Sequence, residues 1–466
     1  MIYARQIESA SHVGDFVVPN SYFLDKELYY RDKQGTYVRK DNLTVEGMIG
    51  VHGIRERRWS APSERAKHLA KRAVEKLSIK PELLIAAHDE WPVPIPAISG
   101  IAQHVLGCGN AAFCDLITNR DLPGTVIAQA LIDCGKYHKV LYATAPGVSA
   151  MRTEEQFDAI KFLEATTLFE EGHKSKRASL ENPETIDFII VDHGEMFESK
   201  SAFVKAELGW TEVHSLDVVD GCPGYIMAVQ IADALIKTGY CRTITCVGAE
   251  ALEKMSDPRH LDHTLYGSAA GATTYQASKE PGIICSHFKG FGHLWHYLRW
   301  DTGVPLADNT PTGPYVVMEG HQLYRFVMRA LPIALNELIR KGAALVSDLD
   351  MSSVVFLLHQ MNGKLIEHAL CGFLGIKASQ QDLLNDEIPE RVVEFIDRQV
   401  PMSVHVYGNS STATIPVTED HARRGLIRRR FSDKPFSEVL AFGSGTKTLK
   451  MSAGAGFSLA GYIERL

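Results

Sequence analysis

The chain has 466 residues, of which 45% are hydrophobic and 23% charged, and its formal net charge is −7. Such a composition is typical of a globular protein, and the length suffices for one large core or two fused cores, because single cores stop growing near about 250–300 residues. The negative charge gives no general attraction for nucleic-acid phosphates or anionic lipid. No stretch approaches the roughly 18 apolar residues of a membrane-spanning helix, and the N-terminus lacks the apolar segment of a signal peptide. We therefore expect a cytoplasmic protein that binds neither nucleic acid nor membrane.

The eight cysteines are scattered and form no CxxC pair, which is typical of a reduced cytosolic protein in which at most one thiol is chemically special. Two groups of histidines could suggest a metal, but they lack accompanying Cys or carboxylate ligands at a known spacing. The groups are His260 with His263, and His287 with His293 and His296. Neither a dinucleotide-binding glycine motif nor a P-loop occurs, so we expect no metal and no cofactor.

Short apolar strands alternate with amphipathic helices along the chain. Strands are predicted at 83–87, 140–144, 186–191, 243–247 and 354–358, and helices at 66–77, 226–238 and 322–341. This alternation predicts an α/β fold with a parallel or mixed sheet covered by helices on both faces. The stretch from Lys289 to Pro314, rich in Gly, Trp and Pro, is predicted to be a long irregular connection.

Two segments of similar length, one starting at Leu83 and one at Phe188, follow the same order of elements. Each is predicted to form a strand, a helix ending in Leu-Gly, a strand, a loop, a helix and a strand. Chance similarity between two ordinary βαβ stretches is one explanation, and a partial duplication is the other. The first segment has 119–124 as its loop, without a cysteine, so we expect this copy to be catalytically silent.

Cys222 stands in a Gly-Cys-Pro-Gly turn between an apolar strand at 216–219 and a helix that begins at once. Proline suits the first position of a helix, which puts Cys222 at or just before a helix N-terminus. There the exposed N–H groups and the helix dipole favour a thiolate, and backbone donors lie beside it, as covalent acyl transfer requires. A lone cysteine is otherwise a small buried hydrophobe, and the local pattern alone leaves both interpretations open.

Two further polar residues follow predicted strands. His359 ends the buried strand 354–358, and Asn409 lies in Val-Tyr-Gly-Asn-Ser-Ser, which is also predicted to be a loop at a strand end. Ligands bind at the carboxyl ends of strands in open α/β sheets. A single histidine of this kind is more often structural, and Gly-Asn alone is a turn signal. Only the joint occurrence with Cys222 favours a catalytic site.

The motifs around these residues resemble those of the β-ketoacyl-acyl carrier protein synthase III family of the thiolase superfamily. The similar segments follow in the family's order and cover most of the chain. They are Gly53–Arg58 with Ala61-Pro62, Asp217–Tyr225, Val247–Glu250, Tyr266–Ala272, Met318–Gly320 to Pro332, His359–Asn362, Gly408–Ser411 and Phe442–Gly445.

The resemblance implies a thiolase-like αβαβα five-layered α/β fold of two similar halves, normally assembled as a homodimer. We expect residues 1–280 to form the half with the nucleophile, including an extra, partly duplicated segment around 83–180. Residues 281–466 would form the half with His359 and Asn409.

The resemblance also implies the roles of the site residues. Cys222 would be the acyl-accepting nucleophile, and His359 and Asn409 would stabilise the enolate formed when a malonyl-type extender loses CO₂. The backbone N–H groups of Cys222 and Ser444 would form the oxyanion hole. The implied substrate-binding residues are Phe197, at a position that crosses the family's dimer interface, Asn362, at a position that contacts the pantetheine arm, and Gly320.

Some positions depart from the family. Where members often have a Trp and an Arg that hold the coenzyme A adenine, this chain has Gly47 and Val51. The partner is therefore an acyl-coenzyme A or an acyl-carrier protein thioester, and the carrier-bound donor is favoured. The chain is also longer than a typical member, which favours a condensing enzyme of specialised polyketide or fatty-acid-derived metabolism. The alternatives are an acyltransferase that uses an O or N acceptor without decarboxylation, and a non-catalytic thiolase-fold subunit.

Overall fold

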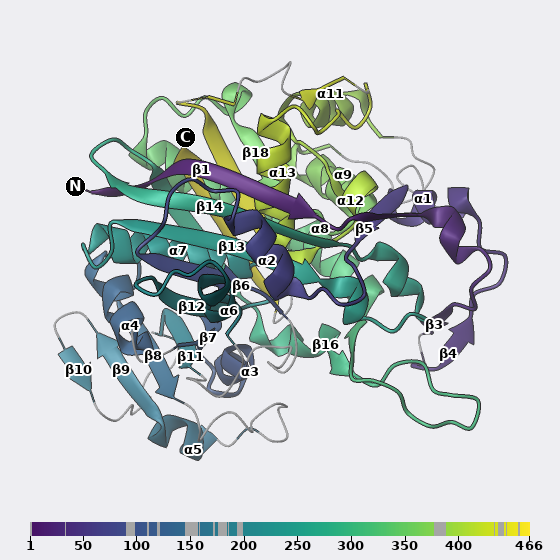
Figure 1. Ribbon diagram of the computed structural model, residues 1–466, viewed down its shortest axis with the longest axis horizontal. Coiled ribbons are helices and arrows are strands. Elements are labelled where there is room, and N and C mark those ends of the chain that lie inside the picture. The colour runs from purple at the N-terminus through teal and green to yellow at the C-terminus, as the bar shows by residue number, and fades with distance from the viewer. Residues whose placement is uncertain are drawn as a thin grey trace.

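The computed structural model describes most of the chain, and two β-sheets dominate its architecture (Figure 1). The described residues are 2–32, 34–89, 98–109, 111–118, 122–144, 157, 159–170, 173–175, 184, 186–192, 199–376, 388–432, 434–436, 442–443, 445–454 and 457–466. Within these ranges one sheet has ten strands and the other has four.

The strands are β1 (Tyr3–Val13), β2 (Phe16–Pro19), β3 (Tyr29–Arg31), β4 (Tyr37–Arg39), β5 (Glu56–Trp59), β6 (Leu83–Ala87), β7 (Ala112–Ile117), β8 (Lys139–Thr144), β9 (Thr166–Glu170), β10 (His173–Ser175), β11 (Phe188–Asp192), β12 (His214–Val219), β13 (Thr243–Ala251), β14 (Ser268–Ser278), β15 (Ile283–Gly290), β16 (Leu298–Asp301), β17 (Tyr315–Met318), β18 (Val355–Leu358), β19 (Lys447–Gly454) and β20 (Ser458–Arg465). The α-helices are α1 (Val45–His52), α2 (Ala66–Val74), α3 (Ile98–Val105), α4 (Gly124–Asp133), α5 (Ala159–Glu164), α6 (Lys200–Glu207), α7 (Gly224–Lys237), α8 (Gly320–Leu345), α9 (Gly363–Phe373), α11 (Glu390–Gln399), α12 (Val404–Tyr407) and α13 (Thr414–Arg423).

The large sheet has the strand order β1-β14-β13-β6-β12-β7-β11-β8-β9-β10. Strand β6 lies between β12 and β13 and runs parallel to both, and all five of its residues are buried. A continuous apolar run such as Leu83–Ala87 is typical of a parallel strand that is covered on both faces. In Figure 1 the blue strands β7 to β11 continue the sheet from β12 toward the lower left.

The small sheet has the order β15-β20-β19-β18, and helices α7 and α13 lie between the two sheets. Helix α7 packs against β6, β12 and β13 on one side and against β19 and β20 on the other. Every residue from Gly224 to Ile236 is buried, as expected for a helix enclosed by two sheets. The α2 and α6 helices cover the other face of the large sheet, and α8 covers the other face of the small one. The predicted five-layered αβαβα fold is therefore confirmed.

The sequence placed two segments incorrectly. Asn409 does not follow a strand, because Val404–Tyr407 forms the short helix α12; Asn409 meets the sheet region only through an isolated bridge to Tyr266. The stretch from Lys289 to Pro314 is also less irregular than predicted. It contains a 3-10 helix at Gly292–Tyr297 and the strand β16, which pairs with β17.

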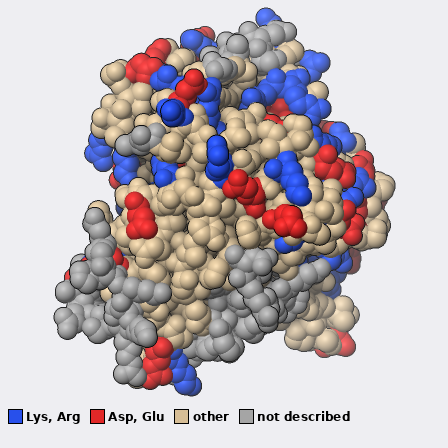
Figure 2. Space-filling view, turned by 60° about the vertical axis from the view of Figure 1, so that its left-hand side comes forward, with Lys and Arg blue, Asp and Glu red and all other residues tan. Residues whose placement is uncertain are grey.

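The outer surface carries charges of both signs. Figure 2 shows Lys and Arg side chains interspersed with Asp and Glu over the face that it presents, with uncharged areas between them. None of the described helices combines the length and the apolar character that crossing a membrane demands.

Candidate active site

Cys222 lies in the tight turn between β12 and α7. Gly221 has a φ of 59°, a backbone conformation that glycine adopts without steric cost, and this turns the chain from the strand into the helix. Pro223 immediately precedes the first residue of α7, so the thiol stands at the positive end of a helix of 14 residues. The turn is held from the other half of the chain, because the Tyr225 N–H donates to Thr412 Oγ1 at 2.6 Å.

Gly454, the last residue of β19, lies directly against this turn. A Cβ atom built on Gly454 would be 2.6 Å from Cys222 Cβ and 2.8 Å from the Cys222 backbone nitrogen. Contacts of that length are sterically impossible, so only glycine allows the end of β19 to approach the nucleophile. The sequence motifs did not single out this residue. The available signal was a glycine that directly follows strand-forming residues.

His359 follows the last residue of β18 and is almost completely buried. Its Nδ1 is 2.7 Å from Thr414 Oγ1. Burial lowers the pKa of His359 to about 3, so the imidazole is neutral at physiological pH. A neutral imidazole carries one ring proton, and the nitrogen that does not face Thr414 donates a hydrogen bond when the Thr414 hydroxyl donates to Nδ1.

Asn409 is held in one orientation by its own loop. Its Oδ1 accepts a hydrogen bond from the Ser411 N–H at 2.8 Å, and a backbone N–H can only donate, which identifies that atom as the oxygen. The Nδ2 amide is therefore the free end available as a donor. Gly408 before it has a φ of 73°, and an added Cβ would lie 2.7 Å from Arg57 Cβ.

One cavity of about 290 Å³ brings these three side chains together. Cys222 comes from the start of α7, His359 from the end of β18 and Asn409 from the loop after α12. The other residues that line the cavity are mostly apolar. They are Val51, His52, Asp89, Leu252, Leu261, Asp262, Thr264, Leu265, Tyr266, Leu298, Val316, Met318, Gly320, Leu323, Tyr324, Met361, Asn362, Leu365, Ser411, Ala453 and Gly454.

Two of the expected substrate-binding residues line the same cavity. Gly320 is the first residue of α8, and Asn362 caps the N-terminus of α9. The Asn362 Oδ1 accepts a hydrogen bond from the Leu365 N–H at 3.0 Å, so its Nδ2 is the part that can face a ligand.

The two remaining expected residues, Phe197 and Ser444, lie outside the described part of the chain. The described neighbours of Ser444 precede β19, and the Gly445 N–H donates to the carbonyl of Leu466. The opposite end of this eight-residue strand is Gly454, which contacts Cys222. An eight-residue strand is roughly 23 Å long. The described backbone that borders Cys222 is at Gly454.

Sequence reasoning missed a row of buried carboxyl groups next to the nucleophile. The parallel register sets Ala87 of β6 opposite Val218 of β12 and Gly248 of β13. Two residues further along each strand stand Asp89, Asp220 and Glu250, which are 3%, 1% and 0% exposed. Of the three, Asp89 is the one that lines the cavity. The available signal was an acidic residue near the carboxyl end of each strand.

Comparison with known proteins is consistent with this geometry. Residues 216–292 match the family model of 3-oxoacyl-[acyl-carrier-protein] synthase III. The β-ketoacyl-[acyl-carrier-protein] synthase III of Xanthomonas euvesicatoria is 28% identical over 267 residues, which cover 55% of this chain and 74% of the relative. The synthase of Pseudoalteromonas atlantica is 28% identical over 272 residues, which cover 57% of this chain and 77% of the relative.

Solved structures show the same fold. The 3-oxoacyl-[acyl-carrier-protein] synthase III of Aquifex aeolicus superimposes with a TM-score of 0.58 at 17% identity, covering 99% of this chain and all of the other. The priming β-ketosynthase of the R1128 polyketide pathway also gives 0.58 at 17% identity, covering 100% and 96%.

The five layers and the cavity at the start of α7 define a thiolase-fold protein. The matched segment around Cys222 and the curated relatives show that the chain is similar to β-ketoacyl-acyl carrier protein synthase III over about half of its length.

Proposed function

We propose that this protein is an acyl-thioester condensing enzyme of the ketosynthase III type, and that Cys222 carries the acyl group. The observation that supports the proposal is the meeting of Cys222, His359 and Asn409, from three separate elements, in one largely apolar cavity. A thiol at a helix N-terminus, next to two neutral hydrogen-bond donors, suits transfer of acyl groups between thiols and carbon.

In the first half-reaction the Cys222 thiolate attacks the carbonyl carbon of an acyl thioester. The oxygen becomes anionic in the tetrahedral intermediate, and the Cys222 N–H at the start of α7 donates to it. The carbonyl reforms, the donor leaves as a thiol after taking up a proton, and the acyl group remains on Sγ as a thioester. The backbone of Gly454 lies against Cys222. We therefore assign Gly454, in place of Ser444, to the second side of the oxyanion hole.

In the second half-reaction a malonyl-type thioester loses CO₂ and becomes an enolate. His359 and the Asn409 amide donate hydrogen bonds to the enolate oxygen, as two donors fixed by Thr414 and Ser411. The enolate carbon attacks the acyl carbon on Cys222, a carbon–carbon bond forms, and the Cys222 thiolate is released. Neither step requires a metal or an organic cofactor.

The acyl donor is proposed to be a thioester of coenzyme A or of an acyl-carrier protein. The apolar walls of the cavity favour an apolar acyl chain. Val51, which is 72% exposed, lies at the rim, and neither it nor Gly47 can hold an adenine by stacking or charge. This favours the carrier protein over free coenzyme A. A homodimer and a cytoplasmic location stay predictions, which the native mass and cell fractionation check.

Intact-mass measurement after incubation with acyl-coenzyme A and acyl-carrier protein thioesters tests the first half-reaction. We expect one acyl adduct, absent in Cys222→Ala and retained in Cys285→Ser. Cys285 is a suitable control because it is half-buried and its burial raises the thiol pKa to about 11. Release of CO₂ from a malonyl thioester then tests condensation. Adduct formation without CO₂ release would favour the plain acyltransferase, and no adduct at all would favour a non-catalytic subunit.

A further inference from the structure

The ten strands of the large sheet fall into two sets of five with the same order and directions. From the centre outward, one set is β12, β6, β13, β14 and β1, and the other is β7, β11, β8, β9 and β10. In each set the first three strands are parallel, and the fourth and fifth are each antiparallel to the strand before them. The sets meet at an antiparallel pair, β12 with β7.

The residue registers also agree between the two sets. In the first set Leu83 is opposite His214 and Ile244, and in the second set its counterpart Phe188 is opposite Ala112 and Val140. The counterparts His214 and Ala112 are 102 positions apart (214 − 112). At the junction Val218 is opposite Leu116, which is again 102 positions away (218 − 116). A residue that pairs with its own counterpart marks a pseudo-two-fold axis, so the junction has the geometry of an isologous interface.

The connections between strands and helices are repeated too. Asp217 in β12 accepts hydrogen bonds from the backbone N–H groups of the first two residues of α6, at 2.5 and 2.9 Å. Its counterpart Asp115 in β7, again 102 positions earlier, accepts them from the first two residues of α3, at 2.9 and 3.0 Å. In both places a buried carboxylate caps the helix that precedes its strand, and this repetition at matching positions argues against chance similarity.

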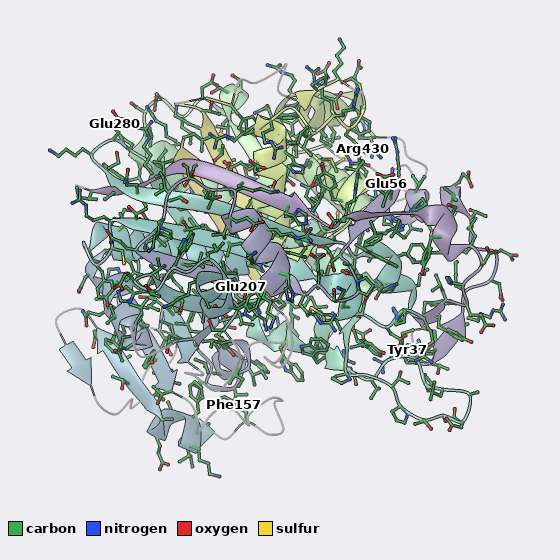
Figure 3. All side chains as sticks on the ribbon, viewed as in Figure 1. Tyr37, Glu56, Phe157, Glu207, Glu280 and Arg430 are labelled. Carbon is green, nitrogen blue, oxygen red and sulfur yellow. The ribbon has the colours of Figure 1, made fainter. Side chains whose placement is uncertain are left out.

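The second set has lost the features of an active site. Leu122, which is buried, stands before Pro123-Gly124 where Cys222 stands before Pro223-Gly224. The four-stranded sheet, which contributes β18 and the His359 position, packs behind the first set through α7, and the described chain supplies no second sheet of that kind. In Figure 3 Phe157, which packs against a core of the second set, lies in the lower part of the molecule, and Arg430 lies in the upper part.

The second set instead supports the nucleophile's own elements. Helix α4 packs against α7, and Lys136, just after α4, forms a 3.0 Å ion pair with the buried Asp233 of α7. Leu116 and Val218 belong to the same apolar core. The edge that β12 would otherwise present is therefore paired over Asp217–Val219.

We propose that residues 98–192 are an internal partner: a copy of the half-sheet around β12 that pairs with it in cis, where a second chain would otherwise be required. The chain thus builds a pseudo-dimeric sheet with one working site, at Cys222. A homodimer cannot then use the part of the β12 edge that β7 occupies, Asp217–Val219.

A disulfide across the pseudo-two-fold pair tests this inference. Opposite residues of an antiparallel pair point to the same face with Cβ atoms about 4.5–5.5 Å apart, close enough to bridge after a small adjustment. We expect the double variant Val218→Cys, Leu116→Cys to form an intrachain bond on mild oxidation, with the mass of a single chain under non-reducing conditions. Co-expressed, differently tagged single variants should give no interchain bond.

A bond between the two tagged chains would show pairing in trans and overturn the inference, and so would the absence of any bond in the double variant. Peptide mapping after acylation provides the second measurement. The acyl group is expected on Cys222 alone, and an adduct on Cys108, Cys114 or Cys134 would contradict the silent copy. If no adduct forms anywhere, the proposed function fails, while the disulfide result still decides the internal partner.

A different observation, the position of Asp89, carries a second inference, which rests on the proposed acyl-Cys222. Asp89 lines the cavity that holds Cys222, and Ser411 Oγ donates a hydrogen bond to its Oδ2 at 3.0 Å. Burial, opposed by the hydrogen bond from Ser411, raises the pKa of this carboxyl above its usual value. Decarboxylation of a malonyl unit creates its own carbanion and needs no base, so the mechanism above leaves Asp89 without a role.

We infer that Asp89 is a catalytic residue that moves a proton for acceptors that carry one: a C–H next to a thioester, or the O–H or N–H of an alcohol or amine. Its carboxylate takes the acceptor's proton while the acceptor attacks the acyl carbon on Cys222. The C–Sγ bond breaks, and the carboxylic acid returns the proton to the departing Cys222 thiolate. General-base catalysis of this kind contributes about 10²–10⁴-fold.

The variant Asp89→Asn, with Asp89→Glu as the conservative control, separates a role in proton transfer from a role in acylation or decarboxylation. In Asp89→Asn we compare acylation of Cys222, release of CO₂ from malonyl-coenzyme A and turnover with acceptors that carry a proton, and we expect the third rate to fall by far more than the first two. Turnover with acetyl-coenzyme A or with ethanolamine should fall at least about hundredfold, with partial rescue in Asp89→Glu. The two acceptors distinguish carbon from heteroatom attack.

Unchanged turnover in Asp89→Asn with an acceptor that the parent uses would overturn the role of Asp89, and so would a parent enzyme that accepts only malonyl thioesters. Failure of the parent to acylate Cys222 at all is a separate result, which rejects the proposed function before Asp89 is considered.

Discussion

The Thr414 hydroxyl determines which nitrogen of His359 carries the proton. Thr414 Oγ1 is within hydrogen-bonding distance of both His359 Nδ1, at 2.7 Å, and the Ser411 carbonyl, at 2.8 Å. It has one proton to donate. When that proton goes to Nδ1, the imidazole carries its own on Nε2 and can donate to an enolate. Thr414 is therefore a positioning residue for the proposed decarboxylation.

Replacing Thr414 by Val keeps the shape but removes this hydrogen bond. We expect CO₂ release from a malonyl thioester to fall about tenfold, which corresponds to a hydrogen bond worth about 1.4 kcal/mol, while acylation of Cys222 changes little. Thr414→Ser should restore most of the loss. Steady-state kinetics and single-turnover acylation check both steps, and an equal loss in both would point to a general structural defect.

Gly454 shows how one missing Cβ permits the site to form. In Gly454→Ala the new methyl group would collide with Cys222 Cβ and with the backbone nitrogen. Overpacking of this kind costs about 1–3 kcal/mol, and here the turn that carries the nucleophile must move. We expect acylation to slow by at least about tenfold, measured by time-resolved intact mass. Gly443→Ala, where an added Cβ meets nothing within 4 Å, should acylate like the parent. A slow Gly443→Ala would instead return the oxyanion hole to the Ser444 segment.

At the scale of the elements, the sequence allowed the strands and helices to be predicted, but not their partners. Apolar runs placed β6 and β13 correctly, and α7 was recognised from its periodicity and its Pro-Gly start. β6 and β11 are both short buried parallel strands, so nothing in their patterns indicates that β6 pairs with β12 while β11 pairs with β7. Pairing depends on contacts between residues far apart in the chain, which periodicity does not encode.

The candidate site was predictable where a motif carries the chemistry. Cys222, His359 and Asn409 each have a recognisable local pattern, and the structure gathers them in one cavity. Asp89 has no motif of its own, because its position matters only through the register of three neighbouring strands. The error at Asn409 has a similar cause: four residues are too few for a helical period to be visible in α12.

The junction between β7 and β12 should be important for the stability of the nucleophile's strand. Leu116 is fully buried at the pseudo-two-fold axis. In Leu116→Asp an unpaired carboxylate would be buried in an apolar core, and we expect a loss of several kcal/mol in the free energy of unfolding, with a slower acylation of Cys222. Urea denaturation, followed by intrinsic fluorescence, measures the free energy of unfolding. Leu306→Asp, at a side chain that is 48% exposed, should stay within about 0.5 kcal/mol of the parent.

At the scale of the whole molecule, one buried ionic cluster joins the layers. Lys450 in β19 forms ion pairs with Glu419 of α13, at 2.6 Å, and with Glu464 of β20, at 2.5 Å. It also donates to Gln6 of β1 at 3.2 Å, so the small sheet, the central layer and the large sheet meet at one ammonium group. All three charged residues are completely buried.

Replacing Lys450 by Met leaves two buried carboxyl groups without their cation. Breaking a buried ion pair from one side costs about 3–5 kcal/mol, and we expect a loss of that order in the free energy of unfolding at pH 8. Burial already raises the pKa of Glu464 above its usual value despite Lys450, and without the cation this carboxyl should hold its proton at still higher pH in the folded state.

The folded variant then binds more protons than its unfolded chain, so its stability falls as pH rises through the raised pKa of Glu464. The difference between Lys450→Met and the parent should therefore shrink from pH 8 to pH 5, measured by denaturant titration at both values. A matched variant at an exposed ion pair, Arg39→Met opposite Glu27, should show a small and nearly constant difference, because its partners are more than half exposed. A Lys450→Met deficit that does not change with pH would mean that the carboxyls stay ionised, and that the central layer admits water.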